Sequence, residues 1–288
     1  MLSVVIVNYN AGTILVDCLT RVCQSATVSQ IILVDNGSSD HSMFLVRQKF
    51  GLDPRLCLLE NGCNLGFSRA NNQALKMLSP ENRYILFLNP DCLITGQILE
   101  KFLVFMERHP QAGLASCLIT NPDGTEQRGC RRRIPTPGNS LGALFAGRQK
   151  FSPGNFNLQG SPLPSKPVEI EAVSGSFMFA RREAIEAVSG FDEGYFLHCE
   201  DLDLCKRLSI AGWQIYFLPD IMVVHYQGTC SQAEPLKVSW HKHCGMERFY
   251  RKFHRRHYGL PMYWLIKAAI WGHFILEIPR NLWKGGHH

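Results

Sequence analysis

The chain has 288 residues, of which 45% are hydrophobic and 19% are charged, and this composition describes a globular protein with an ample core. The formal net charge of +6 is modest, and the length allows one large α/β domain, or one domain with a C-terminal appendage. The eleven cysteines include no Cys-x-x-Cys pair, which predicts reduced thiols in a cytosolic setting and argues against a zinc site, because no ligand spacing supports one.

Strands and helices alternate through the first half of the chain. Short apolar runs predict strands at residues 2–7, 30–34, 56–59, 84–88 and 114–120. The stretches between them predict helices at residues 13–23, 42–50, 68–78 and 96–109. Strands separated by helices of about ten residues imply βαβ crossovers, so we expect a mostly parallel sheet flanked by helices.

The amino-acid composition changes at the start of the second half. Between residues 129 and 167, Pro, Gly, Ser and Asn are frequent and periodicity is lost, which predicts a mobile loop or functional lid. Order returns at residues 168–181, and we expect a helix at 182–188, a helix from Glu200 to about Ala211, strands at 214–218 and 221–224, and a basic helix at 239–257. We therefore divide the chain into a domain at 1–235 and C-terminal helices at 236–288.

The last segment, residues 262–283, is rich in Trp, Ile and Phe. Charged residues and Pro279 interrupt it, which favours an amphipathic helix lying on a membrane over a helix that spans one. The preceding basic helix would add attraction to an anionic membrane surface. The alternatives are a helix packed on the protein's own core and a solvated basic face. The apolar N-terminus is too short for a signal peptide and lacks a basic region, so we expect no export.

The expected strand at 84–88 ends in the turn Asn89, Pro90 and Asp91. A carboxylate at the tip of a buried strand lies where open α/β sheets bind their ligands. Such hard oxygen ligands suit Mg²⁺ or Mn²⁺ held together with a diphosphate. A purely structural turn is the alternative.

Other strands also end in polar turns, which could hydrogen-bond a base and a ribose. Gly66 would permit close backbone approach, and the helix start after it would favour an anion. Turn-making and capping are the alternative for Asn64 and Asn71. Neither a Gly-x-Gly-x-x-Gly turn nor a Walker loop follows the first strand, which weakens a dinucleotide interpretation. The candidate donor-binding residues are Asn8, Tyr9, Asn10, Asp35, Asn36, Asn64, Gly66, Arg69, Asn71, Asn89 and Asp91.

Taken in order, several of these motifs resemble those of glycosyltransferase family 2, and most closely its bacterial rhamnosyltransferase-like branch. They are residues 5–10, 34–40, 64–72, 87–91, 175–178 and 191–201, so the match covers about residues 1–230. The resemblance implies a GT-A fold, which is a Rossmann-like α/β fold, and an inverting transfer of a sugar from a nucleotide-diphosphate donor.

The resemblance also implies roles for individual residues. Asp35 would contact the nucleobase, Asp91 and His225 would bind Mn²⁺ or Mg²⁺, and Asp201 would be the catalytic base. Asn89 stands where the family usually has a first acid, which leaves the metal site poorer by one charge. Glu200 would orient the acceptor or raise the pKa of Asp201 by like-charge repulsion. We further expect phosphate contacts from the arginines of the mobile loop, namely Arg131, Arg132 and Arg133.

These observations together predict a metal-dependent glycosyltransferase, peripheral on the cytoplasmic face of the plasma membrane. Its acceptor would be lipid-diphosphate-linked or a polysaccharide, and no nucleic-acid partner is expected. The branch favours dTDP-L-rhamnose as donor, while UDP and GDP hexoses remain open. The alternatives are a sugar-phosphate nucleotidyltransferase and a catalytically silent binding subunit, but the presence of Asp91, Asp201 and His225 together argues against the silent subunit.

Overall fold

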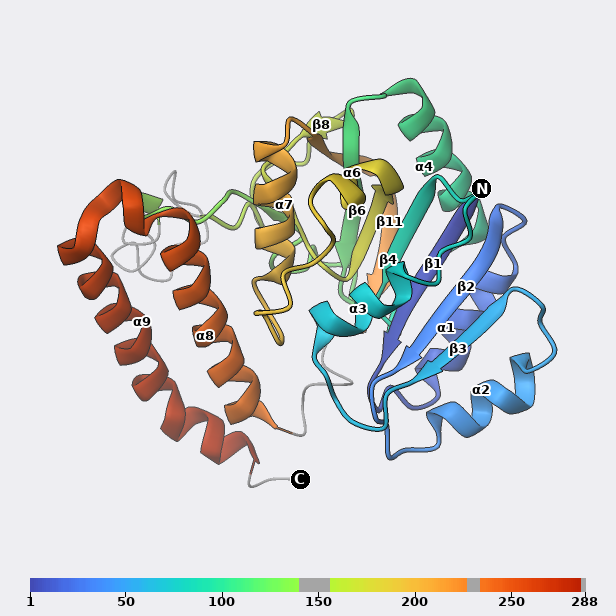
Figure 1. Cartoon of the computed structure of the whole chain (residues 1–288), viewed down its shortest axis with the longest axis horizontal. Helices are drawn as coiled ribbons and strands as arrows, with labels where there is room; N and C mark the ends of the chain where they lie inside the picture. Colours follow the sequence, from blue (N-terminus) through green and yellow to red (C-terminus); the bar gives the residue numbers. More distant parts are fainter. Residues whose placement is uncertain (140–155, 227–233, 286–288) are drawn as a thin grey trace.

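A mixed β-sheet forms the centre of the protein (Figure 1). The computed structural model describes residues 1–139, 156–226 and 234–285, and within them the sheet has nine strands in the order β3-β2-β1-β4-β10-β6-β11-β5, with β8 paired to β11. The strands are β1 (Leu2–Asn8), β2 (Val28–Asp35), β3 (Leu56–Glu60), β4 (Tyr84–Leu88), β5 (Cys92–Leu93), β6 (Ala112–Thr120), β8 (Val168–Glu169), β10 (Phe177–Arg181) and β11 (Gln214–His225). A small second sheet pairs β7 (Arg131–Arg132) with β9 (Ala172–Val173).

The pairing brings several strand ends to one edge of the large sheet. Strands β1, β2, β3 and β4 are parallel, and Asn8 at the end of β1 pairs with Asp35 at the end of β2. Strand β10 runs antiparallel to β4, so its first residue, Phe177, pairs with Leu88 at the end of β4. The expected mostly parallel sheet is confirmed, and its carboxyl edge collects the polar turns.

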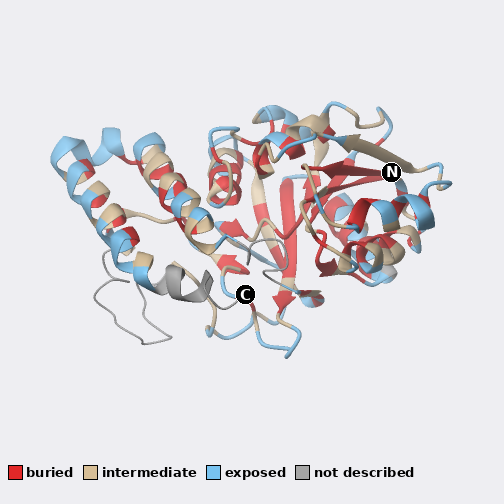
Figure 2. Ribbon diagram, turned by 90° about the horizontal axis from the view of Figure 1, so that it is seen from below, coloured by how far each residue is buried: buried red, intermediate tan, exposed pale blue. Residues whose placement is uncertain are grey.

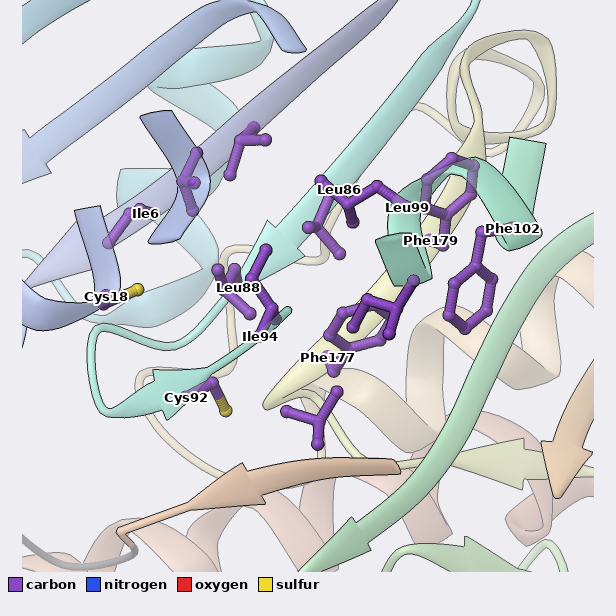
Figure 3. Packing of buried hydrophobic residues seen from close by; sticks show 14 of the residues in the cluster. Ile6, Cys18, Leu86, Leu88, Cys92, Ile94, Leu99, Phe102, Phe177 and Phe179 are labelled. Carbon is purple, nitrogen blue, oxygen red and sulfur yellow. The ribbon is translucent and has the colours of Figure 1, made fainter. Parts of the chain in front are cut away.

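Helices cover both faces of the sheet (Figure 1). Alternate strand residues point to opposite faces, so Phe177 and Phe179 join one hydrophobic cluster, whereas Met178 joins the other. On the first face, Phe102 packs against Phe177 and Phe179, with ring centroids 5.1 and 5.2 Å apart (Figure 3). The helices are α1 (Ile14–Cys23), α2 (Ser42–Phe50), α3 (Phe67–Leu75), α4 (Gly96–Arg108), α6 (Arg182–Ala187) and α7 (Glu200–Ile210).

Most of the expected elements are present, but two predictions were wrong. The basic helix expected at 239–257 is divided, because one helix ends at Phe253 and the next begins at Arg255. Residues 214–218 and 221–224 were expected to be two strands and instead form the single strand β11. Its pairing with β6 slips, since Leu218 faces Cys117 and Met222 faces the next residue, Leu118. The strand is therefore irregular at residues 219–221, which include Pro219, a residue that cannot donate a backbone hydrogen bond.

Two long helices follow the sheet, α8 (Pro235–Phe253) and α9 (Arg255–Gly285), and they lie side by side as a hairpin (Figures 1 and 2). A kink interrupts α9 at Gly259, whose φ is 76°. The hairpin is fastened to the sheet domain by Lys252 on α8, whose ammonium lies 2.7 Å from Asp192 and 2.6 Å from Asp203. None of the helices in the described residues has an apolar stretch long enough to cross a membrane.

Candidate active site

Asp91 and His225 meet at the carboxyl edge of the sheet. Asp91 follows β4, and His225 ends β11, which pairs with the short strand β5 beside Asp91. The Asp91 Oδ1 and His225 Nε2 atoms lie 3.0 Å apart, and both side chains are buried. The Cys92 thiol completes a cluster that could hold a metal. Burial raises the pKa of Cys92 well above its usual range, so this sulfur stays protonated and is a poor ligand for a hard cation.

Gln127 determines which nitrogen of His225 can bind a metal. The side-chain oxygen of Gln127 lies 2.6 Å from His225 Nδ1, while its amide nitrogen donates to Asn121 and to the His225 carbonyl. The Gln127 oxygen must therefore accept a proton from Nδ1, which leaves the lone pair of a neutral imidazole on Nε2, facing the Asp91 carboxylate. The amide of Asn89 also lies 3.4 Å from Nε2, and the carboxylate and Nε2 can be bridged either by a proton or by a cation that takes its place. These residues fit a divalent metal.

The polar residues on β1 and β2 hold each other at the same edge. Asn8 is fully buried, and its amide donates to Asp35 at 2.9 Å and to the hydroxyls of Ser38 and Ser42. Asn10 has a positive φ of 54°, and its side-chain oxygen accepts the backbone N–H of Ser39 at 2.8 Å. Asn8 thus shapes the turn after Asp35 from beneath, while Tyr9 and Asn10 lie nearer the surface.

The turn at 64–67 makes a close contact within the protein. A Cβ on Gly66 would lie 2.7 Å from the carbonyl oxygen of Phe196, and the N–H of Phe67 donates to that same oxygen at 2.8 Å. Phe196 therefore makes the close backbone approach expected at Gly66 and takes the Phe67 N–H, while an anion at the start of α3 stays a prediction. Asn64 and Asn36 hydrogen-bond each other at 2.8 Å.

Two other expected donor contacts on α3 are engaged within the chain. Asn71 is buried, and its amide donates to the carbonyl of Phe67 at 2.9 Å. Arg69 is half-exposed and lies 3.2 Å from Glu193, in the loop that precedes α7. Asn72, which the sequence did not single out, binds the backbone of Phe191 through both ends of its amide. Helix α3 thus positions the loop at 191–199.

Asp201 is held by three donors at the start of α7. The guanidinium of Arg132 lies 2.6 Å from Asp201 Oδ2, and the N–H groups of Gly175 and Leu202 donate at 3.0 and 2.7 Å. Burial raises the pKa of Asp201, but the Arg132 charge and these hydrogen bonds outweigh it and hold the pKa below its usual range. The expectation that Glu200 raises the pKa of Asp201 is therefore wrong in its net effect.

The pKa of Glu200, rather than that of Asp201, is raised. Burial, reinforced by the charge of Asp201, raises the pKa of Glu200 to about 8. Its Oε2 atom is buried and has no hydrogen-bond partner among the described residues. The pKa values of the two adjacent carboxyl groups thus differ, so that Asp201 favours the ionised form and Glu200 the protonated form. Neighbouring acids that serve different roles show such a difference.

The turn that precedes these acids is strained. His198 and Cys199 have φ values of 69° and 67°, in the left-handed region that non-glycine residues seldom adopt. Gly245 on α8 packs directly against this turn, since a Cβ there would lie 2.8 Å from the His198 carbonyl oxygen. The hairpin therefore supports the loop that carries Glu200 and Asp201.

The three expected phosphate-binding arginines are placed differently from one another. Arg131 is buried and binds both carboxylate oxygens of Glu126 at 2.8 Å, so its fork is directed at a carboxylate within the chain. Arg132 binds Asp201, and the backbone N–H of Arg133 donates to Phe156. Residues 140–155, the centre of the expected mobile loop at 129–167, lie outside the described residues.

Asp201 and the Asp91–His225 pair are linked through the backbone between them. The N–H of Asn89 donates to the Ser176 carbonyl at 2.9 Å, and the adjacent Gly175 donates to Asp201. The structure therefore brings Asp35, Asp91, Asp201 and His225 to one sheet edge. Sequence reasoning missed Gln127 and the pairing of Arg132 with Asp201, because both contacts join residues far apart in the chain.

Comparisons with known proteins agree with this arrangement. The model of the family described as glycosyl transferase family 2 matches residues 3–188. An N-acetylglucosaminyl-diphospho-decaprenol L-rhamnosyltransferase of Mycobacterium tuberculosis is 26% identical over 280 residues, which cover 94% of this chain and 90% of that protein. The rhamnosyltransferase WbbL of Escherichia coli is 29% identical over 206 residues, covering 68% and 72%.

Solved structures show the same fold. The mannosyltransferase PcManGT from Pyrobaculum calidifontis, in complex with GDP-Man and Mn²⁺, superposes with a TM-score of 0.59 at 16% identity, covering 99% of this chain and 72% of that one. TarS 1–349 from S. aureus, in complex with UDP-GlcNAc, gives a TM-score of 0.56 at 16% identity, covering 89% and 74%.

Proposed function

The chain belongs to glycosyl transferase family 2 and has the GT-A fold, and from that premise we propose that it is an inverting, metal-dependent glycosyltransferase. The donor is a nucleotide-diphosphate sugar, with dTDP-L-rhamnose the first candidate because similar proteins are named rhamnosyltransferases. The acceptor is lipid-diphosphate-linked or a polysaccharide. The observation that carries the proposal is the convergence of the Asp91–His225 pair and Asp201 on one sheet edge.

Each group has a distinct task in a direct displacement at the anomeric carbon. Asp201 accepts the proton of the acceptor hydroxyl, and its lowered pKa keeps the carboxylate ionised at neutral pH. Arg132 and the Gly175 N–H hold the carboxylate in place. Asp91 and His225 would hold Mn²⁺ or Mg²⁺, whose chemistry here is to stabilise the negative charge of the leaving diphosphate.

The donor nucleotide is proposed to lie along the edge formed by β1 and β2. Asp35 faces the nucleobase, with Tyr9, Asn10 and Asn36 around it, and Asn8 supports the turn from below. Arg69 and Asn89 remain candidates for donor contacts. Glu200 is proposed to orient the acceptor, because a protonated carboxyl group can donate a hydrogen bond to it at neutral pH.

The outer face of α9 supports a membrane location. Between residues 261 and 279 the exposed side is apolar apart from His273, and it comprises Pro261, Trp264, Leu265, Ala268, Gly272, Ile275, Leu276 and Pro279. We call these eight residues the apolar face. The exposed arginines at the bend of the hairpin, Arg251, Arg255 and Arg256, add attraction to anionic headgroups. We propose that this face lies on the cytoplasmic surface of the plasma membrane, which brings the site to a lipid-linked acceptor.

A transfer assay with the full chain tests the proposal. Nucleotide sugars, including dTDP-L-rhamnose and UDP and GDP hexoses, would be offered with a polyprenyl-diphosphate-linked acceptor. We expect release of nucleoside diphosphate and a product of inverted anomeric configuration by NMR. EDTA should stop the transfer, and Mn²⁺ or Mg²⁺ should restore it.

The same assay separates the alternatives. A nucleotidyltransferase would release pyrophosphate from a nucleoside triphosphate and a sugar phosphate. A silent subunit would bind a nucleotide sugar without consuming it. Full transfer in the presence of EDTA would refute the metal dependence but not the glycosyltransferase activity.

A further inference from the structure

Three metal-ligating side chains meet between α8 and α9, away from the site described above. His243 lies on α8, while His273 and Glu277 lie one turn apart on the facing side of α9. One candidate ligand atom from each residue lies within 4.8 Å of the other two. The helices bring together residues 30 positions apart, which is why the spacing of residues in the sequence did not reveal this group.

The two histidines are already at a separation that suits one ion. His243 Nε2 lies 3.1 Å from His273 Nδ1. In tetrahedral zinc sites with Zn–N bonds of 2.0–2.1 Å, two nitrogen ligands stand about 3.3 Å apart. An ion could thus be bound by small side-chain adjustments, without moving either helix.

His243 has the environment of a prepared ligand. It is fully buried, and its Nδ1 lies 2.7 Å from the backbone carbonyl oxygen of Ser239. That oxygen can only accept, so Nδ1 carries the proton and the Nε2 lone pair points toward His273. A ring nitrogen that donates to a carbonyl while the other faces the metal is the usual support of a histidine ligand.

Glu277 supplies the negative charge of the group. Its carboxylate accepts a hydrogen bond from the Ser239 hydroxyl at 2.8 Å and lies 3.4 Å from the ammonium of Lys242. Lys242 offsets part of this charge, so a bound cation would share the carboxylate with it. His273 is half-exposed, which leaves room for water as a further ligand.

We propose that His243, His273 and Glu277 bind a divalent transition-metal ion, Zn²⁺ in the first instance, with water in the fourth position, and that the ion fastens α9 to α8. Two imidazoles and one carboxylate suit zinc, whereas the oxygen-rich diphosphate site suits Mn²⁺ or Mg²⁺. The ion would stabilise the hairpin that presents the apolar face. A simple hydrogen bond between the two imidazoles is the competing explanation.

Cobalt titration of the full chain tests the proposal. His287 and His288 would first be replaced by serine, so that the terminal pair cannot bind metal. After treatment with a chelator, Co²⁺ is added without nucleotide. We expect one equivalent to give the strong visible absorption of tetrahedral cobalt, and Zn²⁺ to displace it. His273→Gln should weaken binding by at least roughly tenfold, since even loss of a supporting contact costs that much.

Two matched variants decide the outcome. His257→Gln changes an exposed histidine at the bend of the hairpin and should leave the spectrum unchanged. His225→Gln should also leave it unchanged, which separates this ion from any bound beside Asp91. Absence of the tetrahedral spectrum, or an equal spectrum in His273→Gln, would overturn the proposal. Zn²⁺ should raise the melting temperature of the parent chain but not that of His273→Gln, and an equal response of both would favour the hydrogen bond.

Discussion

The sheet domain and the hairpin distribute polarity in opposite ways. In the sheet domain the apolar side chains are buried on both faces of the strands, and the buried carboxylates Asp35, Asp91 and Asp201 lie at the sheet edge. In the hairpin, Lys267 and Glu277 on α9 point toward α8, where Lys267 binds Glu247 at 2.8 Å, while the apolar face looks outward. This difference in polarity is the basis of the membrane location proposed for α9.

The first experiment acts on the sheet domain alone. Asp201→Asn removes the proposed base but can still accept hydrogen bonds, so the fold and donor binding should persist. Turnover should fall by roughly 10²–10⁴-fold, the usual worth of a positioned base. Single-turnover transfer with bound donor measures this. Asp220→Asn, at an exposed aspartate, is the control and should keep full turnover; near-native turnover in Asp201→Asn would remove the assignment.

A second experiment concerns the metal pair. Gln127→Leu removes the oxygen that accepts the proton of His225 Nδ1. The Mn²⁺ concentration for half-maximal transfer should rise roughly 10–100-fold, the typical loss for a contact that orients a metal ligand. Gln48→Leu changes an exposed glutamine on α2 and should leave the metal response as it was. Equal Mn²⁺ dependence in the two variants would mean that Gln127 does not orient His225.

The third experiment reverses the polarity of the hairpin. Trp264→Glu combined with Leu276→Glu places two charges on the apolar face. Trp264 is 61% exposed and Leu276 is 79% exposed. Burial of each side chain contributes about 1.5–3 kcal/mol, so binding to anionic liposomes should fall by at least about tenfold. Flotation measures it. Leu52→Glu, at a leucine that is 99% exposed on the sheet domain, is the control; equal flotation of both variants would refute the membrane face.

The smallest expected effect is on the pH dependence of stability. The pKa of Glu200 is raised to about 8 in the folded protein. The contribution of Glu200 to the free energy of unfolding is therefore complete below the unfolded pKa near 4.5 and is lost as the pH rises through about 8. Glu200→Gln stays neutral, so its melting temperature should fall less than that of the parent chain between pH 6 and pH 9. Parallel curves would show that the shift of Glu200 is not large.

Local patterns were sufficient to predict most of the fold. The strand at Tyr84–Leu88 and the helix at Ser42–Phe50 agree with the structure at both ends, because buried strands and helix starts leave their signals in neighbouring residues. Strand β11 was misread because Pro219 resembles a terminus, whereas the pairing with β6 continues beyond it. A bulge depends on the partner strand, which local periodicity does not contain.

The candidate site was predictable only in part for the same reason. The residue types at the strand tips were visible, and the structure places Asp91 beside His225. The contacts that tune them are long-range: Gln127 supports a histidine 98 positions away, and Arg132 meets Asp201 across 69 positions. Gly66 was assigned to a ligand because nothing nearby in the sequence indicates Phe196.

Gly245 has a practical consequence for anyone who engineers this chain. Replacing a helical glycine with alanine is a common route to a more stable protein, with a gain of up to about 1 kcal/mol. At position 245 the added methyl group would press on the carbonyl of His198, at a turn that is already strained, and would displace the loop that carries Asp201. Gly272 on α9 has open space around it. Thermostability should therefore be sought at position 272, while a substitution at position 245 would weaken catalysis by moving the turn beside Glu200 and Asp201, without replacing either acid.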